Sequence, residues 1–171
     1  PSVAEGIRWG AEIYHALKSV LKEKGYATLV GDEGGYAPAL KANNEAIEVI
    51  LAAIEKAGFK AGRGADVAIA LDPAASELFE EDTKLYNLRK EGKKLTGEQM
   101  VEFYAKWVKD YPIVSIEDGH AQDDWASWVV MQKELGDKIQ IVGDDLLVTN
   151  PERVKRGIQD KTCNALLVKL N

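Results

Sequence analysis

The stretch Ile113-Val114-Ser115-Ile116-Glu117-Asp118 is a short apolar run that ends in two carboxylates. Four other apolar runs of similar length lie at residues 27–30, 67–71, 139–142 and 165–168. Nearly continuous apolar runs are typical of strands that are buried on both faces, as they are in parallel sheets. The sequence therefore predicts about five strands of a parallel sheet.

Amphipathic stretches separate these runs and predict helices. Apolar residues recur at helical spacing from residue 3 to about 24, from 43 or 44 to 58, from 96 or 97 to about 110, from 123 or 124 to 136, and from 151 onward. Asn43 or Asn44 and Asn150 are the expected N-caps of the second and the last helix. The charged segment 78–94 predicts a short outlying hairpin, and the sequence indicates no internal domain boundary. Alternating helices and buried strands indicate an α/β fold, either an open doubly wound sheet or a (β/α) barrel.

Charged residues follow every predicted strand. They are Asp32-Glu33, Asp72, Glu117-Asp118, Asp144-Asp145 and Lys169. A single acid after a strand is often only the N-cap of the next helix. In a (β/α) barrel, however, the carboxyl ends of all strands converge on one rim, where catalytic groups from several strands meet. Five such ends in succession therefore favour the barrel over the open sheet.

Side-chain alternation along the strands separates two sets of carboxylates. Asp72, Glu117 and Asp144 are predicted to face the barrel axis, whereas Asp118 and Asp145 are predicted to point away as supporting or capping groups. Three inward carboxylates repel one another unless a cation lies between them. Oxygen ligands without His or Cys suit magnesium or manganese better than zinc.

Lys169 follows the last predicted strand and is the candidate general base. A lysine beside a bound dication is expected to have a depressed pKa, which prepares it to accept a proton. The alternative is a lysine that only pairs with a neighbouring acid.

The loop Gly31-Asp32-Glu33-Gly34-Gly35-Tyr36-Ala37-Pro38 is the other concentrated signal, because its glycines permit close backbone approach around a carboxylate. The loop lacks the Gly-Lys-Ser/Thr of a phosphate-binding loop, and a plain turn is the alternative.

These motifs resemble, in the same order, those of the enolase family. They are 31–38, Ala70-Leu71-Asp72-Pro73-Ala74-Ala75-Ser76-Glu77, Tyr111 to Gly119, Gly143-Asp144-Asp145-Leu146-Leu147-Val148-Thr149-Asn150 and Leu167-Val168-Lys169-Leu170-Asn171. Gly119 is more similar to bacterial enolases than to those of animals or yeast. The resemblance implies that residues 1–171 form part of an enolase-type catalytic barrel domain, with the N-terminal capping domain and the barrel ends outside it.

The resemblance also implies an activity. Enolases are lyases that reversibly dehydrate 2-phospho-D-glycerate to phosphoenolpyruvate in glycolysis and gluconeogenesis. Asp72, Glu117 and Asp144 would hold magnesium. Glu33 would be the acid that helps to expel the 3-hydroxyl group, and Lys169 the base that takes the C2 proton.

Two other functions remain open: a non-catalytic barrel fragment that acts as a scaffold or binding module, and another superfamily reaction such as racemisation or cycloisomerisation. The Lys-x-Lys motif that those other enzymes often carry on a barrel strand is absent from the predicted strands. Because much of the substrate site lies elsewhere in an enolase, we expect the 171-residue chain alone to be inactive.

The composition indicates which partners and which cellular compartment to expect. The net charge of −6 without a basic patch argues against a nucleic-acid partner, and no apolar run is long enough for a membrane span. Cys163, the single cysteine, suits a reducing cytosol, and no signal peptide is expected. The resemblance implies a cytoplasmic homodimer or homo-octamer, in a family for which surface display is known. His120 is expected to face solvent or to pack a loop.

Overall fold

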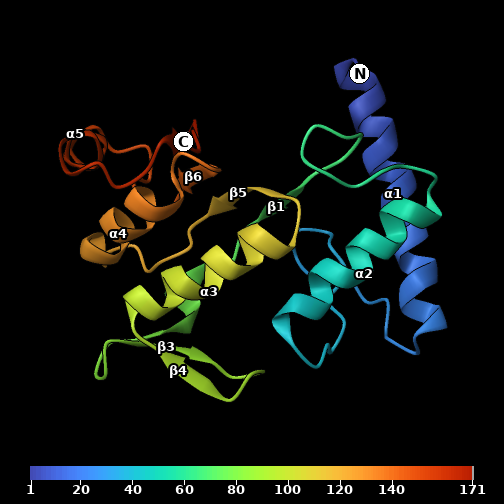
Figure 1. Ribbon diagram of the computed structural model, residues 1–171, viewed down its shortest axis with the longest axis horizontal. Coiled ribbons are helices and arrows are strands. Elements are labelled where there is room, and N and C mark those ends of the chain that lie inside the picture. Colours follow the sequence, from blue (N-terminus) through green and yellow to red (C-terminus); the bar gives the residue numbers. More distant parts are fainter. Residues whose placement is uncertain (171) are drawn as a thin grey trace. The chain divides into compact units, whose positions relative to one another are not determined.

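The computed structural model describes residues 1–170, and its elements are labelled in Figure 1. Asn171, the last residue of the motif that begins at Leu167, lies outside the described residues. The chain forms two compact units, Pro1–Ala68 and Ile69–Asn171. The sequence indicated no internal boundary, and the difference arises because the segment around residue 30 does not join the parallel sheet of the second unit.

Two packed helices form the first unit. Helix α1 (Val3–Glu23) begins with a capping box between Ser2 and Glu5, and helix α2 (Asn43–Lys56) begins after Ala42. Ala42 makes no side-chain capping bond, so the predicted asparagine N-cap of α2 is wrong. The buried core between the helices consists of Val20, Leu21, Val49 and Ala53.

The predicted strand at residues 27–30 is wrong. Val30 forms only an isolated antiparallel bridge to Tyr36, and Leu29 is 75% exposed. The Gly31 N–H donates to the Gly35 carbonyl oxygen at 2.8 Å, and Gly34 adopts a φ of +82°. The glycines thus turn the chain back on itself, so the segment pairs locally instead of entering a sheet.

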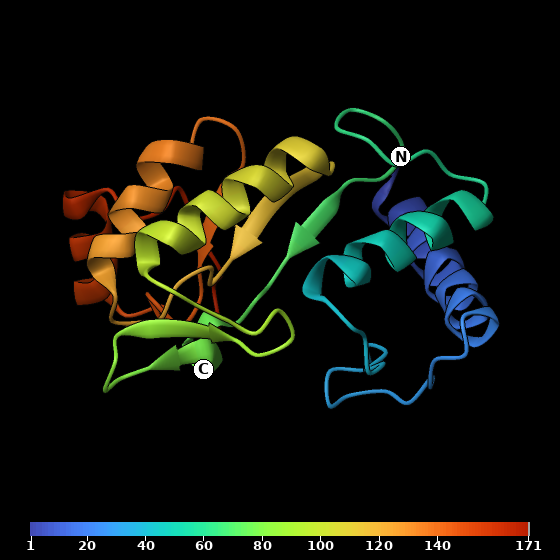
Figure 2. The same ribbon diagram turned by 60° about the horizontal axis from the view of Figure 1, so that its bottom comes forward.

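The second unit is built on a parallel sheet. Its strands are β1 (Ile69–Leu71), β5 (Ile113–Glu117), β6 (Gln140–Gly143) and β7 (Ala165–Leu166), in the spatial order β1-β5-β6-β7. Helices α3 (Gly97–Asp110), α4 (Trp125–Leu135) and α5 (Pro151–Asp160) connect them (Figure 2). The predicted α/β fold, a segment of a (β/α) barrel, is confirmed for these four strands.

Burial along the strands largely follows the predicted alternation. Ile116 and Ile141 are fully buried, whereas Gln140 is exposed. Val114 departs from the pattern, because 38% of its surface is exposed. The polar cap of α5 is as predicted, since the Asn150 side chain accepts hydrogen bonds from the Glu152 and Arg153 N–H groups.

A small antiparallel sheet lies between β1 and α3 in the sequence. A 3-10 turn (Ala75–Leu78) leads into β2 (Phe79–Glu80), β3 (Leu85–Leu88) and β4 (Lys93–Leu95). The predicted hairpin is therefore confirmed, but it is not outlying. Tyr86 of β3 is fully buried, and its hydroxyl donates to Asp124 Oδ2 at 2.7 Å and accepts from the Ala121 N–H at 3.0 Å. Among the described helices, none is long and apolar enough to cross a membrane.

Candidate metal centre

Carboxylates gather where the parallel strands end. Asp72 follows β1, Glu117 ends β5 and Asp144 follows β6, and these three strands are neighbours in the sheet. Burial raises the pKa of Glu117, and the negative charges of Asp72 and Asp144 raise it further, whereas Lys169 opposes the shift. The structure therefore brings the predicted ligands and the predicted base within electrostatic range of one another.

The tightest acidic group differs from the predicted ligand set. Asp118, Asp144 and Asp145 each offer a carboxylate oxygen, and these oxygens lie within 4.8 Å of one another. Of this set only Asp144 was a predicted ligand. Asp118 and Asp145 were predicted as supporting or capping groups, and the two backbone N–H groups that the Asp118 carboxylate accepts agree with that role. Asp118 has a φ of +42°, a left-handed conformation that ends the strand alternation on which the prediction rested.

Asp118 is held by backbone N–H groups of the segment that follows β6. Its Oδ1 accepts from the Asp144 N–H at 3.0 Å, and its Oδ2 accepts from the Asp145 N–H at 2.8 Å. Only 4% of its surface is exposed. Burial raises the pKa of Asp118, and the two N–H groups act in the opposite direction because they stabilise the carboxylate.

Lys169 forms an ion pair within the centre. Its Nζ lies 2.7 Å from Asp144 Oδ2, and its backbone N–H donates to Thr149 Oγ1 at 3.0 Å. The hydrogen bond to Asp144 raises the pKa of Lys169. Beside a bound dication the sequence predicted a depressed pKa, and the ion pair with a carboxylate acts in the opposite direction.

Glu33 lies in the exposed glycine-rich loop of the first unit. The Tyr14 hydroxyl donates to the Gly34 carbonyl oxygen at 2.8 Å, and the Tyr14 and Tyr36 rings stack at 4.4 Å. These contacts fix the loop to α1. The catalytic role of Glu33 stays a prediction.

The donor set fits a hard divalent cation. The acidic side chains at the centre supply only carboxylate oxygens, and Lys169 pairs with one of them, Asp144. They are Asp72, Glu117, Asp118, Asp144 and Asp145. Carboxylates outnumber the lysine here, and the negative charges of Asp72 and Asp144 add to burial in raising the pKa of Glu117. Carboxylate oxygens without His or Cys suit magnesium, calcium or manganese.

His120 follows β5, and the sequence predicted that it faces solvent or packs a loop. It is fully buried, its Nε2 lies 3.0 Å from the Gly97 carbonyl oxygen, and its ring contacts those of Tyr86, Tyr104 and Trp128. Burial lowers its pKa. The loop-packing expectation is confirmed and the solvent-facing one is wrong. No local sequence signal could have shown this, because the partners come from three separate elements.

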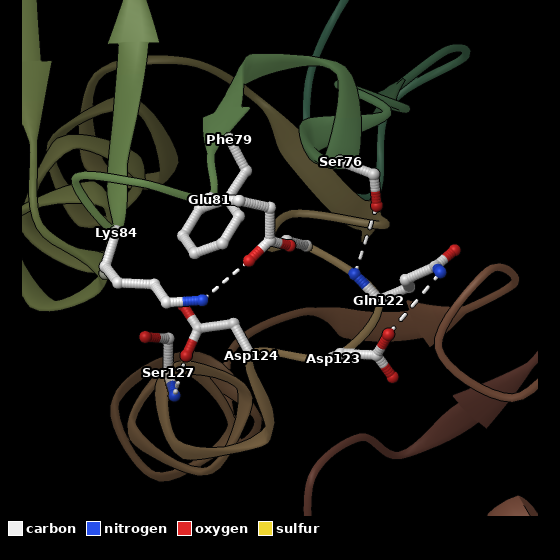
Figure 3. A pocket seen from close by; sticks show the side chains of 10 residues that line it. Ser76, Phe79, Glu81, Lys84, Gln122, Asp123, Asp124 and Ser127 are labelled. Atoms are coloured by element: carbon white, nitrogen blue, oxygen red, sulfur yellow. Dashed lines mark hydrogen bonds and ion pairs between the residues drawn. The ribbon is translucent and has the colours of Figure 1, made fainter.

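A cavity of about 560 Å³ is lined in part by residues of the segments that follow β1 and β5 (Figure 3). Ser76 follows β1, and Gln122 follows β5; the Ser76 Oγ accepts from the Gln122 N–H at 3.0 Å. Across the cavity, Lys84 Nζ pairs with Glu81 at 2.6 Å. Nothing in the sequence indicated this cavity, because segments far apart in the chain line it.

One comparison with known proteins bears on this arrangement. A family model described as enolase, C-terminal TIM barrel domain, matches residues 1–171. The match agrees with the parallel α/β architecture and with the carboxylates at the strand ends, which is where barrel enzymes carry their active sites. The chain belongs to the enolase C-terminal TIM barrel domain family.

Proposed function

We propose that the protein carrying this chain is an enolase, a magnesium-dependent lyase that interconverts 2-phospho-D-glycerate and phosphoenolpyruvate. The observation that carries the proposal is the convergence of Asp72, Glu117, Asp144 and Lys169 at the ends of adjacent parallel strands, in a chain that belongs to this family. The bacterial type, suggested by Gly119, is part of the same proposal.

The carboxylates prepare the site for a cation. Asp72, Glu117 and Asp144 would hold magnesium, and Asp118 and Asp145 add negative charge beside them. When held by these carboxylates, magnesium would supply positive charge to stabilise the negative charge that develops on the substrate carboxylate as the adjacent carbon loses its proton. A Lys or His base beside magnesium is the arrangement already known for enolase-superfamily sites, so the pairing with Lys169 is what membership of the family leads us to expect.

Lys169 accepts the C2 proton on Nζ in its neutral form. The ion pair with Asp144 and the Thr149 hydroxyl on its backbone hold the lysine at the carboxylate cluster. Glu33 then donates a proton to the 3-hydroxyl group as the C3–O bond breaks, so that water leaves and the C2–C3 double bond forms. Proton transfer by positioned side chains of this kind contributes about 10²–10⁴-fold to the rate.

We further propose that the protein works in the cytoplasm as a homodimer or homo-octamer on small phosphorylated substrates, without binding nucleic acid directly. The net charge of −6 supports the last part, because nucleic-acid binders normally carry the opposite balance.

Phosphoenolpyruvate formation from 2-phosphoglycerate tests the proposal. In the intact protein that carries this chain we expect magnesium-dependent product, lost on chelation, and there Lys169→Ala should lower kcat by at least about 100-fold. Lys155→Ala is the matched control, since Lys155 pairs with Glu152 on the exposed surface of α5 and should be dispensable for activity. Absence of phosphoenolpyruvate, together with racemisation of another carboxylic acid, would show a different reaction of the superfamily.

A further inference from the structure

Asp118 joins three segments at the candidate metal centre. Its carboxylate receives the N–H groups of Asp144 and Asp145, and its own N–H donates to the Val142 carbonyl oxygen at 3.0 Å. Its carbonyl oxygen accepts from the Ala75 N–H at 2.9 Å, in the loop that follows Asp72. The residue thus ties the end of β5 to the end of β6 and to the loop after β1.

Both carboxylate oxygens of Asp118 are engaged by backbone amides. The residue is buried, and the left-handed φ of +42° aims its side chain across the end of β6 rather than along the strand direction. A non-glycine residue is strained in this conformation, and such strain persists only where surrounding contacts enforce it.

The backbone held by Asp118 is that of a proposed ligand. The Asp144 N–H fixes the peptide from which the Asp144 side chain projects, and the Asp145 N–H fixes the next peptide. Two parallel hydrogen bonds to one carboxylate define an orientation as well as a position. Groups that support metal ligands in this way tune the affinity of the site.

We infer that Asp118 is a positioning residue, which orients the Asp144 carboxylate for a divalent cation through the two backbone amides and does not itself bind the metal. The inference rests on the proposed function in one respect, namely that Asp144 is a metal ligand.

Asp118→Asn is the informative variant. An amide keeps the size of the side chain but offers only one acceptor oxygen, so one of the two N–H groups then faces an NH₂ donor. Asp123→Asn is the matched control: it removes the same charge from the same loop, where the Asp123 side chain is 65% exposed and pairs with Arg153.

Magnesium affinity, measured by calorimetry on the purified protein, is the first readout. We expect Asp118→Asn to weaken magnesium binding by about 10–100-fold, which is the usual effect of removing a group that supports a metal ligand. At saturating magnesium its kcat should return to within a few-fold of the wild-type value, and Asp123→Asn should bind as the wild type does. Unchanged affinity in Asp118→Asn would overturn the inference. Wild-type protein that binds no magnesium would instead refute the proposed function.

A crystal of the wild-type protein with manganese gives the second readout, and it does not depend on a variant that folds. Both Asp118 oxygens should remain on the amides of Asp144 and Asp145, outside the roughly 2.0–2.6 Å at which oxygen ligands bind such cations. An Asp118 oxygen within that distance of the manganese would make it a ligand and would contradict the positioning role.

Discussion

Tyr86 and Tyr104 form a matched pair of buried tyrosines with opposite hydroxyl environments. Tyr86 is fully buried and Tyr104 is 2% exposed. The Tyr86 hydroxyl donates to Asp124 and accepts from the Ala121 N–H, whereas the Tyr104 hydroxyl has no hydrogen-bond partner among the described residues. Burial raises the pKa of both hydroxyls, so both stay protonated at neutral pH.

Only Tyr86→Phe should therefore lower the free energy of unfolding. Tyr86→Phe leaves the Ala121 N–H buried without an acceptor, which costs about 1–3 kcal/mol, and removes a hydrogen bond to the Asp124 carboxylate that contributes about 1.5–3 kcal/mol. The two losses share one hydroxyl and do not add in full, so the free energy of unfolding should fall by about 3 kcal/mol. Tyr104→Phe removes a hydroxyl that lacks a partner, so stability should be unchanged or raised by about 1 kcal/mol.

Urea unfolding of the wild type and of both variants, followed by circular dichroism, measures the difference. The slope against urea should be equal in the three proteins, so that a shift in midpoint reports stability alone. Equal destabilisation by the two variants would refute this reasoning, because it would show that the hydrogen bonds of the hydroxyl groups do not decide the outcome. A Tyr86→Phe variant within about 0.5 kcal/mol of the wild type would refute it as well.

Two other predictions concern His120 and Gly97, whose carbonyl oxygen lies 3.0 Å from the His120 Nε2. His120 has a lowered pKa in the folded state, so below about 6.5 the unfolded chain binds a proton that the folded chain does not. The contribution of His120 to the free energy of unfolding should therefore be full above that pH and fall by up to about 1.4 kcal/mol per pH unit below it. His120→Leu should lessen this fall. Urea unfolding at pH 7 and pH 5 measures it. If the unfolding free energy of His120→Leu fell as much as that of the wild type, carboxylates alone would account for the pH dependence. Gly97→Ala places a Cβ 1.7 Å from Ser127 Oγ and should lower the unfolding free energy by about 1–3 kcal/mol. Gly6→Ala in α1 meets nothing within 4 Å and should raise it by about 0.5–1 kcal/mol, so a thermal shift of the same sign in both would contradict the clash.

The sequence predicts the fold best where a pattern is local and long. Four apolar runs become the parallel strands, and the helices begin and end close to their capping residues, as at Thr96 and Asn150. The run at 27–30 fails because four apolar residues do not specify a sheet partner, and the adjacent glycines favour a local turn.

The candidate site was predictable in its residues but not in its detailed geometry. The gathering of Asp72, Glu117, Asp144 and Lys169 follows from parallel strands that end at one edge. The bonds of Asp118 to the Asp144 and Asp145 N–H groups accompany a left-handed backbone conformation at a non-glycine residue, for which propensity gives no signal.

Exchange of the C2 hydrogen of 2-phosphoglycerate with solvent deuterium, followed by NMR, tests the central claim most directly. The claim is that Lys169, beside the carboxylates at the strand ends, removes this proton. We predict that this exchange requires magnesium, persists in Lys155→Ala and is lost in Lys169→Ala. Exchange at the wild-type rate in Lys169→Ala would show that another group is the base and would contradict the account.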